Sequence, residues 1–288
     1  MDIKSFRDIP PWDWPTGAGK MFLKVLRDDQ ADESDRLTAA ELAGDFVVVN
    51  DELADSLLTV LQNTDESETL RSTAASSLGP ALEEAYTAEF EDSEYMPITE
   101  AMFHRIQETL HDLYEHADTP KEVRRRLLEA SVRAPQDWHQ DAVHTAYASN
   151  DEDWKLTAVF SMRFIRGFED QILESLDSDN PNIHYQAVRA AGAWEVAEAW
   201  PHIAALIASE KCEKRLVFAA IEAAVTVGPE EAGMVLGDLL GSEDEDIVEA
   251  AYEAIAMISF LDEEEMLLGD EDDFTWGDED DEDGKVFH

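Results

Sequence analysis

The sequence is poor in basic residues. Its 288 residues include 21 Lys and Arg against 67 Asp and Glu, which gives a formal net charge of −46 at pH 7. A surface this negative repels phosphates, which excludes direct binding of nucleic acid or of anionic membranes through charge neutralisation. Two explanations of the charge stay open. Either the protein presents carboxylates to a basic partner, or it is built for high intracellular salt, where screening makes the self-repulsion tolerable.

Cysteine and long apolar runs are also scarce. Cys212 is the only cysteine, so the sequence excludes an internal disulfide and a thiolate metal cluster. No apolar run approaches the roughly 20 residues that a membrane-spanning helix needs, and the first residues lack the basic-then-apolar order of a signal peptide. We therefore expect a cytoplasmic protein.

What the sequence does contain is a repeated helical pattern. Each copy has a polar turn and a large apolar anchor residue, often followed by Arg or Lys, with Ala four positions on and apolar residues five and eight positions on. This spacing lines one face of a helix with apolar side chains. The anchors are Leu70, Val123, Trp154, Ile183, Leu216 and Ile247, with Asp35 in the same place in a degenerate first copy.

Each anchor helix is preceded by a second stretch with helical apolar spacing. A period of roughly 30 residues with two helices per unit is the signature of a stacked solenoid. We therefore predict an all-α fold, an α-solenoid of about seven helical hairpins. One longer interval contains an insertion from Gly79 to Pro97, which we expect to be a helix extension or a loop.

The pattern divides the chain into three segments. Residues 1–16 form an N-terminal arm whose three prolines exclude an uninterrupted helix, and we expect its tryptophans to cover the first repeat. The alternative is a ligand for a proline-recognising module. Residues 17–261 form the solenoid. Residues 262–288, with fourteen acids and one Lys, form a tail that we expect to be disordered because it cannot bury enough apolar surface. Its Phe274 and Trp276 are candidates for docking into a basic apolar groove; the alternative is a plain solubilising tail.

The repeats resemble HEAT repeats, which are related to armadillo repeats and to the HEAT-like repeats of phycobilin lyases. The resemblance covers about residues 17–261 and implies a right-handed superhelix whose second helices line a concave, protein-binding surface. Val217 and Val248 depart from it, because they replace the basic residue after the anchor. The resemblance rests on Leu70-Arg71 with Ala74 and Leu78-Gly79, Val123-Arg124, Trp154-Lys155 with Ala158, and Ile183 with Ala187 and Gly192.

Basic residues suggest a partner-binding region. Arg36, Arg71, Arg124 and Lys155 follow successive anchors and would align in a ladder, which in similar proteins pairs with acids of the neighbouring turn. The window from residue 121 to residue 166 contains eight bases and seven acids, so it is near neutral in an otherwise acidic chain.

Within this window, Lys155, Arg163 and Arg166 would fall within about 80° of one another on a single helix at 100° per residue. We therefore predict a cationic groove formed with Arg124 and flanked by two residues of a neighbouring loop. The alternative is that the tryptophans belong to the core and the arginines pair with local acids. The candidate partner-binding residues are Arg124, Trp138, His139, Lys155, Arg163 and Arg166.

The motifs for metal and nucleotide binding are incomplete. His104, Glu108, His111 and Glu115 follow helical spacing and include a di-iron-like Glu-x-x-His fragment, but a full site needs a second such motif. The Gly17-Ala-Gly-Lys20 stretch lacks the first glycine of a phosphate loop. We therefore expect no metal, no cofactor and no catalytic residue.

These features predict a non-catalytic scaffold or adaptor that binds a protein or peptide on its concave face. Its carboxylates would steer basic partners and repel wrong ones. Two alternatives stay open: a subunit of an enzyme similar to the phycobilin lyases, and an acidic mimic of DNA that occupies a basic protein.

Overall fold

The computed structural model describes residues 2–88, 96–209 and 211–269, with only the backbone given for Pro229 and for residues 261–269. Every regular element within these residues is a helix, so the all-α prediction is confirmed. The chain divides into two compact units, residues 1–194 and 195–288. No helix in the described part of the chain is both long enough and apolar enough to span a membrane.

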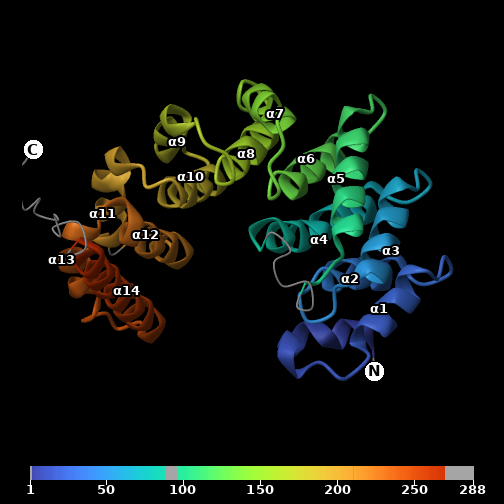
Figure 1. Ribbon diagram of the computed structural model, residues 1–288, viewed down its shortest axis with the longest axis horizontal. Helices are drawn as coiled ribbons and strands as arrows, with labels where there is room; N and C mark the ends of the chain where they lie inside the picture. The colour runs from blue at the N-terminus through green and yellow to red at the C-terminus, as the bar shows by residue number, and fades with distance from the viewer. Residues whose placement is uncertain (1, 89–95, 210, 270–288) are drawn as a thin grey trace, which may run out of the picture. The chain divides into compact units, whose positions relative to one another are not determined.

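The first unit consists of five helical hairpins (Figure 1). Its second helices pack on one another in order, α2 on α4, α4 on α6, α6 on α8 and α8 on α10. The hairpins are α1 (Ala18–Leu26) with α2 (Glu33–Ala43), α3 (Asp51–Gln62) with α4 (Glu68–Thr87), α5 (Glu100–Glu115) with α6 (Lys121–Ser131), α7 (Trp138–Tyr147) with α8 (Glu152–Ser161), and α9 (Glu169–Leu176) with α10 (Pro181–Ala193).

The second unit adds two hairpins. A short 3-10 helix, η3 (Ala197–Ala199), leads into α11 (Trp200–Ile207), which packs on α12 (Lys214–Val227). The last hairpin is α13 (Pro229–Leu239) with α14 (Glu245–Gly269), and α14 packs on α12. Within the described residues the two units contain seven hairpins, where about seven were predicted, and each predicted anchor lies in the second helix of its pair.

Some of the Asp and Asn side chains cap the N-termini of these helices. The side chain of Asp151 accepts the backbone N–H of Asp153 at the start of α8, and Asn180 accepts the N–H groups of Asn182 and Ile183 in α10. Such caps satisfy backbone donors that lack a partner in the first turn, and a carboxylate there also faces the positive end of the helix dipole.

The N-terminal arm contains two 3-10 helices, η1 (Ile3–Asp8) and η2 (Pro11–Asp13). The indole of Trp14 packs edge-on against Phe6 and Phe22, and its N–H lies 3.1 Å from the carbonyl oxygen of Phe6. Trp12, in contrast, is exposed. One of the two indoles therefore covers the first hairpin.

Two helices extend beyond the repeat pattern. Helix α4 continues through Gly79 and Pro80 to Thr87, so the insertion begins as a helix extension; residues 89–95 lie outside the described residues. Helix α14 continues to Gly269, past the predicted start of the tail at residue 262. Glu, Met and Leu, which fill residues 263–268, are good helix formers, so acidity alone does not end the helix. Phe274 and Trp276 lie outside the described residues.

Candidate functional site

The arginines that follow the first anchors belong to the fold. Arg36 donates to the carbonyl oxygen of Leu26 at 3.2 Å, and Nε of Arg71 donates to that of Leu61 at 2.9 Å. Each acceptor lies at the C-terminal end of the first helix in the same hairpin, where carbonyl groups lack helical partners. The ladder therefore caps helices.

Arg124 has the same role in the third hairpin. Its Nη2 atom lies 3.0 Å from the carbonyl oxygen of His116, 3.2 Å from that of Ala117 and 3.3 Å from that of Thr119. These carbonyls follow the end of α5, so the guanidinium closes the turn between α5 and α6. The predicted partner-binding arginine is thus already engaged with backbone.

Its neighbours in α6 pair with local acids. Arg125 is buried, and it donates to Glu122 at 2.7 Å and to the hydroxyl of Thr157 in α8 at 2.9 Å. Arg126 contacts Glu122 at 2.8 Å and Glu129 at 2.6 Å. Arg125 and Arg126 therefore pair with acids of the same protein, as the alternative interpretation of the basic window predicts.

Lys155 lies half-buried in the first turn of α8. Its ammonium lies 4.7 Å from the centre of the Tyr147 ring and 3.7 Å from a carboxylate oxygen of Glu174. This residue therefore joins α8 to the helices on either side of it in sequence, α7 and α9.

Arg163 and Arg166 are not on the same helix as Lys155, so the predicted single cationic helix face is wrong. Helix α8 ends at Ser161, and the amides of Arg163 and Phe164 then bond to carbonyls three residues earlier. Such turns advance about 120° per residue and redirect the side chains. The chain changes direction here because Ile165 and Phe168 are both buried in the core.

The segment after α8, the end of α8 and the residues that follow α6 and α10 contribute to an arginine–aromatic patch. Its members are Arg133, Phe160, Arg163, Phe164, Arg166 and Trp194. The guanidinium of Arg133 lies 5.5 Å from the centre of the Phe160 ring and 5.4 Å from that of Phe164. Arg163 lies 5.3 Å from the Phe164 ring. Each contact of this kind contributes about 0.5–1 kcal/mol at an exposed site.

Arg166 and Trp194 complete the patch. Arg166 is exposed, and its guanidinium lies 4.7 Å from the centre of the Trp194 ring. The indole N–H of Trp194 donates to the carbonyl oxygen of Met162 at 2.7 Å, which fixes the ring beside the segment that carries the arginines. Sequence reasoning identified Arg163 and Arg166 but missed Arg133 and Trp194 as members of their group.

Trp138 and His139 take different positions in α7. Trp138 stacks on His111 with ring centres 4.7 Å apart, and it also contacts Tyr114, so it joins α7 to α5. His139 is fully buried, and its Nε2 lies 2.9 Å from the hydroxyl of Ser131. A side chain with no exposed surface cannot contact a partner, so His139 serves the core.

A cavity of about 320 Å³ lies beside these residues. Helices α5, α6 and α8 each contribute one large side chain to its wall, which are Tyr114, Arg124 and Trp154. Burial raises the pKa of the Tyr114 phenol, so this group stays protonated at neutral pH. The cavity can therefore offer a hydroxyl and aromatic surface to a side chain of a partner.

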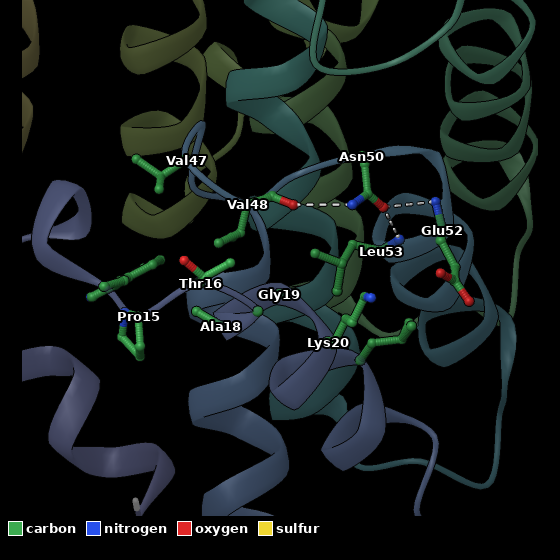
Figure 2. Close-up of a pocket in the computed structure, with 13 residues that line it drawn as sticks. Pro15, Thr16, Ala18, Gly19, Lys20, Val47, Val48, Asn50, Glu52 and Leu53 are labelled. Atoms are coloured by element: carbon green, nitrogen blue, oxygen red, sulfur yellow. Dashed lines mark hydrogen bonds between the residues drawn. The ribbon is translucent and has the colours of Figure 1, made fainter.

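A second cavity, of about 380 Å³, lies between the start of α1 and the start of α3 (Figure 2). The Gly17-to-Lys20 stretch forms one wall, while Val48 and Leu53 supply apolar surface. The amide oxygen of Asn50 accepts the N–H groups of Glu52 and Leu53, as Figure 2 shows, so that side chain is committed to capping α3. Sequence reasoning missed this cavity, although its glycine stretch was noted.

The histidines of α5 do not gather at a metal site. His111 stacks on Trp138, while His104 lies 3.8 Å from Glu100. Among the residues that the structure describes, no group of three or more His, Cys, Asp and Glu could hold a metal ion. Burial raises the pKa of Cys212, which disfavours a reactive thiolate.

Comparison with known proteins identifies the repeat. Residues 169–256 match the family model of HEAT repeats, and no curated protein matches the chain in sequence. Solved structures with some similarity include YibA of Escherichia coli, with 16% identity, a TM-score of 0.44 and coverage of 85% of this chain and 84% of that one.

Two further structures are similar at the same level. Human deoxyhypusine hydroxylase has 16% identity, a TM-score of 0.40 and coverage of 90% of this chain and 88% of its own. The CpcE–CpcF complex of phycocyanin lyase from Nostoc sp. PCC7120 has 16% identity and a TM-score of 0.45, and the match covers 88% of this chain and 98% of that one. Residues 169–256, which run from α9 into α14, therefore consist of HEAT repeats, because the family model matches them directly.

Proposed function

We propose that this protein is a non-catalytic scaffold or adaptor, and that the arginine–aromatic patch is its contact surface for a protein or peptide partner. The observation that carries the proposal is the position of Arg166, which is exposed while its guanidinium lies over the ring of Trp194. Arg and Trp are among the residue types that most often carry binding energy at interfaces. An Arg held over a ring keeps its N–H groups directed outward for a carboxylate.

The chemistry of the patch suits binding. Guanidinium groups keep their charge at every physiological pH, and Phe and Trp rings do not exchange protons. These side chains can therefore hold a partner through charge, stacking and apolar contact, but they cannot act as general acids or bases at neutral pH.

The charge of the chain limits the partner. With a formal net charge of −46, the protein repels a uniformly acidic molecule at long range. A suitable partner therefore offers a carboxylate for Arg166 within a surface that is otherwise neutral or basic. Its apolar side chains would pack on Phe164 and Trp194.

The test is affinity purification of the tagged full-length chain from its host, with Arg163 and Arg166 both replaced by Glu. A matched control replaces Arg27 and Arg105 by Glu, because each is a half-exposed arginine outside the patch with an ion pair of its own. Circular dichroism verifies that both variants stay folded. We expect a specific partner that is lost with the patch variant and retained with the control.

The variant Arg166→Lys separates the effect of charge from that of the guanidinium group, because Lys keeps the charge but lacks the planar group with several donors. With the purified partner, we expect this variant to bind more weakly than the unchanged protein and more tightly than Arg166→Glu. A partner that binds all patch variants with unchanged affinity would refute the patch as the contact surface.

A further inference from the structure

The outward face of α14 carries a row of exposed apolar side chains, the α14 stripe, which consists of Tyr252, Ala256, Met257 and Phe260. Tyr252 is 69% exposed, Met257 58% and Phe260 59%, whereas Ala251, Ala254 and Ile258 on the other side of the helix are buried. Residues four apart lie above one another on a helix, so Tyr252, Ala256 and Phe260 form one line.

The preceding repeat shows what normally covers such a line. Aligning the anchors Leu216 and Ile247 places Tyr252 at the position of Ile221 and Ala256 at that of Val225. On α12, which packs against α14, Ile221 is only 2% exposed and Val225 only 5% exposed. The same repeat position is therefore buried on α12, against which α14 packs, and exposed on α14.

Charge selects the kind of helix. Glu249 and Glu253 lie on the same exposed face as the α14 stripe, and the sequence contains no Lys or Arg between Arg215 and Lys285. A second copy of α14, or the acidic residues 270–288, would bring carboxylates against carboxylates. A helix with Lys or Arg beside its apolar face would instead pair with Glu249 and Glu253.

We propose that the α14 stripe binds a basic amphipathic helix of a partner protein, in the place that the second helix of a following repeat would occupy. Helices that dock in this way present apolar anchors at positions i, i+3 or i+4, and i+7. The stripe faces them with side chains at i, i+4 and i+8, which are Tyr252, Ala256 and Phe260. Met257 adds an adaptable surface that tolerates different anchor side chains. This surface belongs to the second unit and is independent of the arginine–aromatic patch.

The test uses the full chain and a fluorescein-labelled synthetic probe, an 18-residue peptide of Leu and Lys with Leu on one helical face. A control peptide has the same composition in an order without helical periodicity. We expect the amphipathic peptide to bind more tightly than the control, and replacement of both Tyr252 and Phe260 by Ala to weaken its binding by roughly tenfold or more. Fluorescence anisotropy measures both.

Matched variants separate this site from other surfaces. Replacement of Phe46 and Val47 by Ala removes exposed apolar side chains of the first unit, and Arg163→Glu with Arg166→Glu alters the arginine–aromatic patch; neither should change peptide binding. Because all these residues are half-exposed or exposed, the substitutions should leave the fold intact, which circular dichroism verifies.

Four results would overturn the proposal. The two peptides could bind equally, which indicates charge attraction alone, or the Tyr252 and Phe260 variant could bind unchanged. Replacement of Phe274 and Trp276 by Ala could abolish binding, which assigns the site to the tail. Finally, light scattering could show that the chain associates with itself and that the Tyr252 and Phe260 variant does not. This result would show that the stripe binds a second copy of the chain.

Discussion

Lys121 at the start of α6 donates to the carboxylate of Asp153 in the first turn of α8, across a distance of 2.9 Å. The relationship recurs in the second unit, where Lys214 of α12 donates to Asp246 of α14 at 2.6 Å. In both cases the partners lie 32 residues apart and connect the starts of consecutive second helices. The same ion pair between consecutive second helices therefore occurs once in each of the two compact units.

The first prediction concerns this pair. Hydrogen bonds from Lys121 hold the pKa of Asp151 and of Asp153 below the usual range. Stability gained from a carboxyl group with a lowered pKa is complete above its unfolded value of about 4 and is lost as the pH falls through the folded value. Lys121→Met should therefore destabilise the protein near neutral pH, and its difference from the unchanged protein should shrink in acid.

Thermal unfolding at several pH values, in low salt and in molar salt, measures this effect. The difference should also shrink in molar salt, because these side chains are exposed and their attraction is screened. Lys24→Met is the matched control, since Lys24 is an exposed lysine of α1 that forms no ion pair with any residue that the structure describes. An equal change in both variants would show that the ion pair contributes nothing specific.

The second prediction concerns His139. Burial lowers the pKa of its imidazole to about 4, and the ring is held by the backbone N–H of Gln136 on Nδ1 and by the hydroxyl of Ser131 on Nε2. The unfolded state, with a pKa near 6.5, binds more protons below that pH. The neutral buried ring therefore costs up to about 3 kcal/mol of stability as the pH falls from about 6.5 to about 4.

His139→Gln removes the titrating group. We expect the free energy of unfolding of this variant to depend less on pH between about 6.5 and 4 than that of the unchanged protein, measured by urea denaturation. His104→Gln, a substitution at an exposed histidine, is the matched control. An unchanged slope in the His139 variant would contradict a buried, neutral imidazole.

The third prediction concerns Arg36 and Glu66, whose side chains are both largely buried. Two nitrogen atoms of Arg36 each donate to a carboxylate oxygen of Glu66 at 2.7 Å. Arg36→Met leaves Glu66 without its charge partner, and we expect a loss of about 3 kcal/mol in the free energy of unfolding. Lys4→Met, which removes the exposed pair with Asp35, should have a far smaller effect. Similar losses in the two variants would contradict the role of burial.

The fourth prediction contrasts two glycines. A Cβ atom at Gly44 would lie 2.2 Å from the carbonyl oxygen of Ser77, a backbone atom that cannot rotate away. Gly44→Ala should therefore cost about 1–3 kcal/mol or more through overpacking. Gly233, within α13, has nothing within 4 Å of such an atom, so Gly233→Ala should stabilise the helix by about 0.5–1 kcal/mol. Urea denaturation of both variants checks the opposite signs.

The repeat pattern was enough to predict the hairpins because its information is local. Leu70, Val123 and Ile183 each belong to an apolar face with helical spacing, and all three are buried where the pattern predicts. The capping role of Asp151 and Asn180 could also be predicted, because a cap depends on the residue type and its place before the helix.

The candidate site was harder to predict, because helical spacing does not show where a helix ends. Lys155, Arg163 and Arg166 have spacings that suit one face, yet α8 ends at Ser161 because burial of the following apolar residues redirects the chain. The residue type of His139 and its neighbours favour a role in binding, but packing places its side chain in the core.

Residue order alone predicts the helical class, the approximate number of hairpins and the acidic character of the chain, since periodicity and charge follow directly from it. Which side chains meet and which stay exposed depends on tertiary packing. Arg166 lies over Trp194, 28 residues away in the sequence, because the hairpin of α7 and α8 packs against the hairpin of α9 and α10. Tyr252 is exposed while its counterpart Ile221 is buried, because burial depends on whether another helix lies against that face.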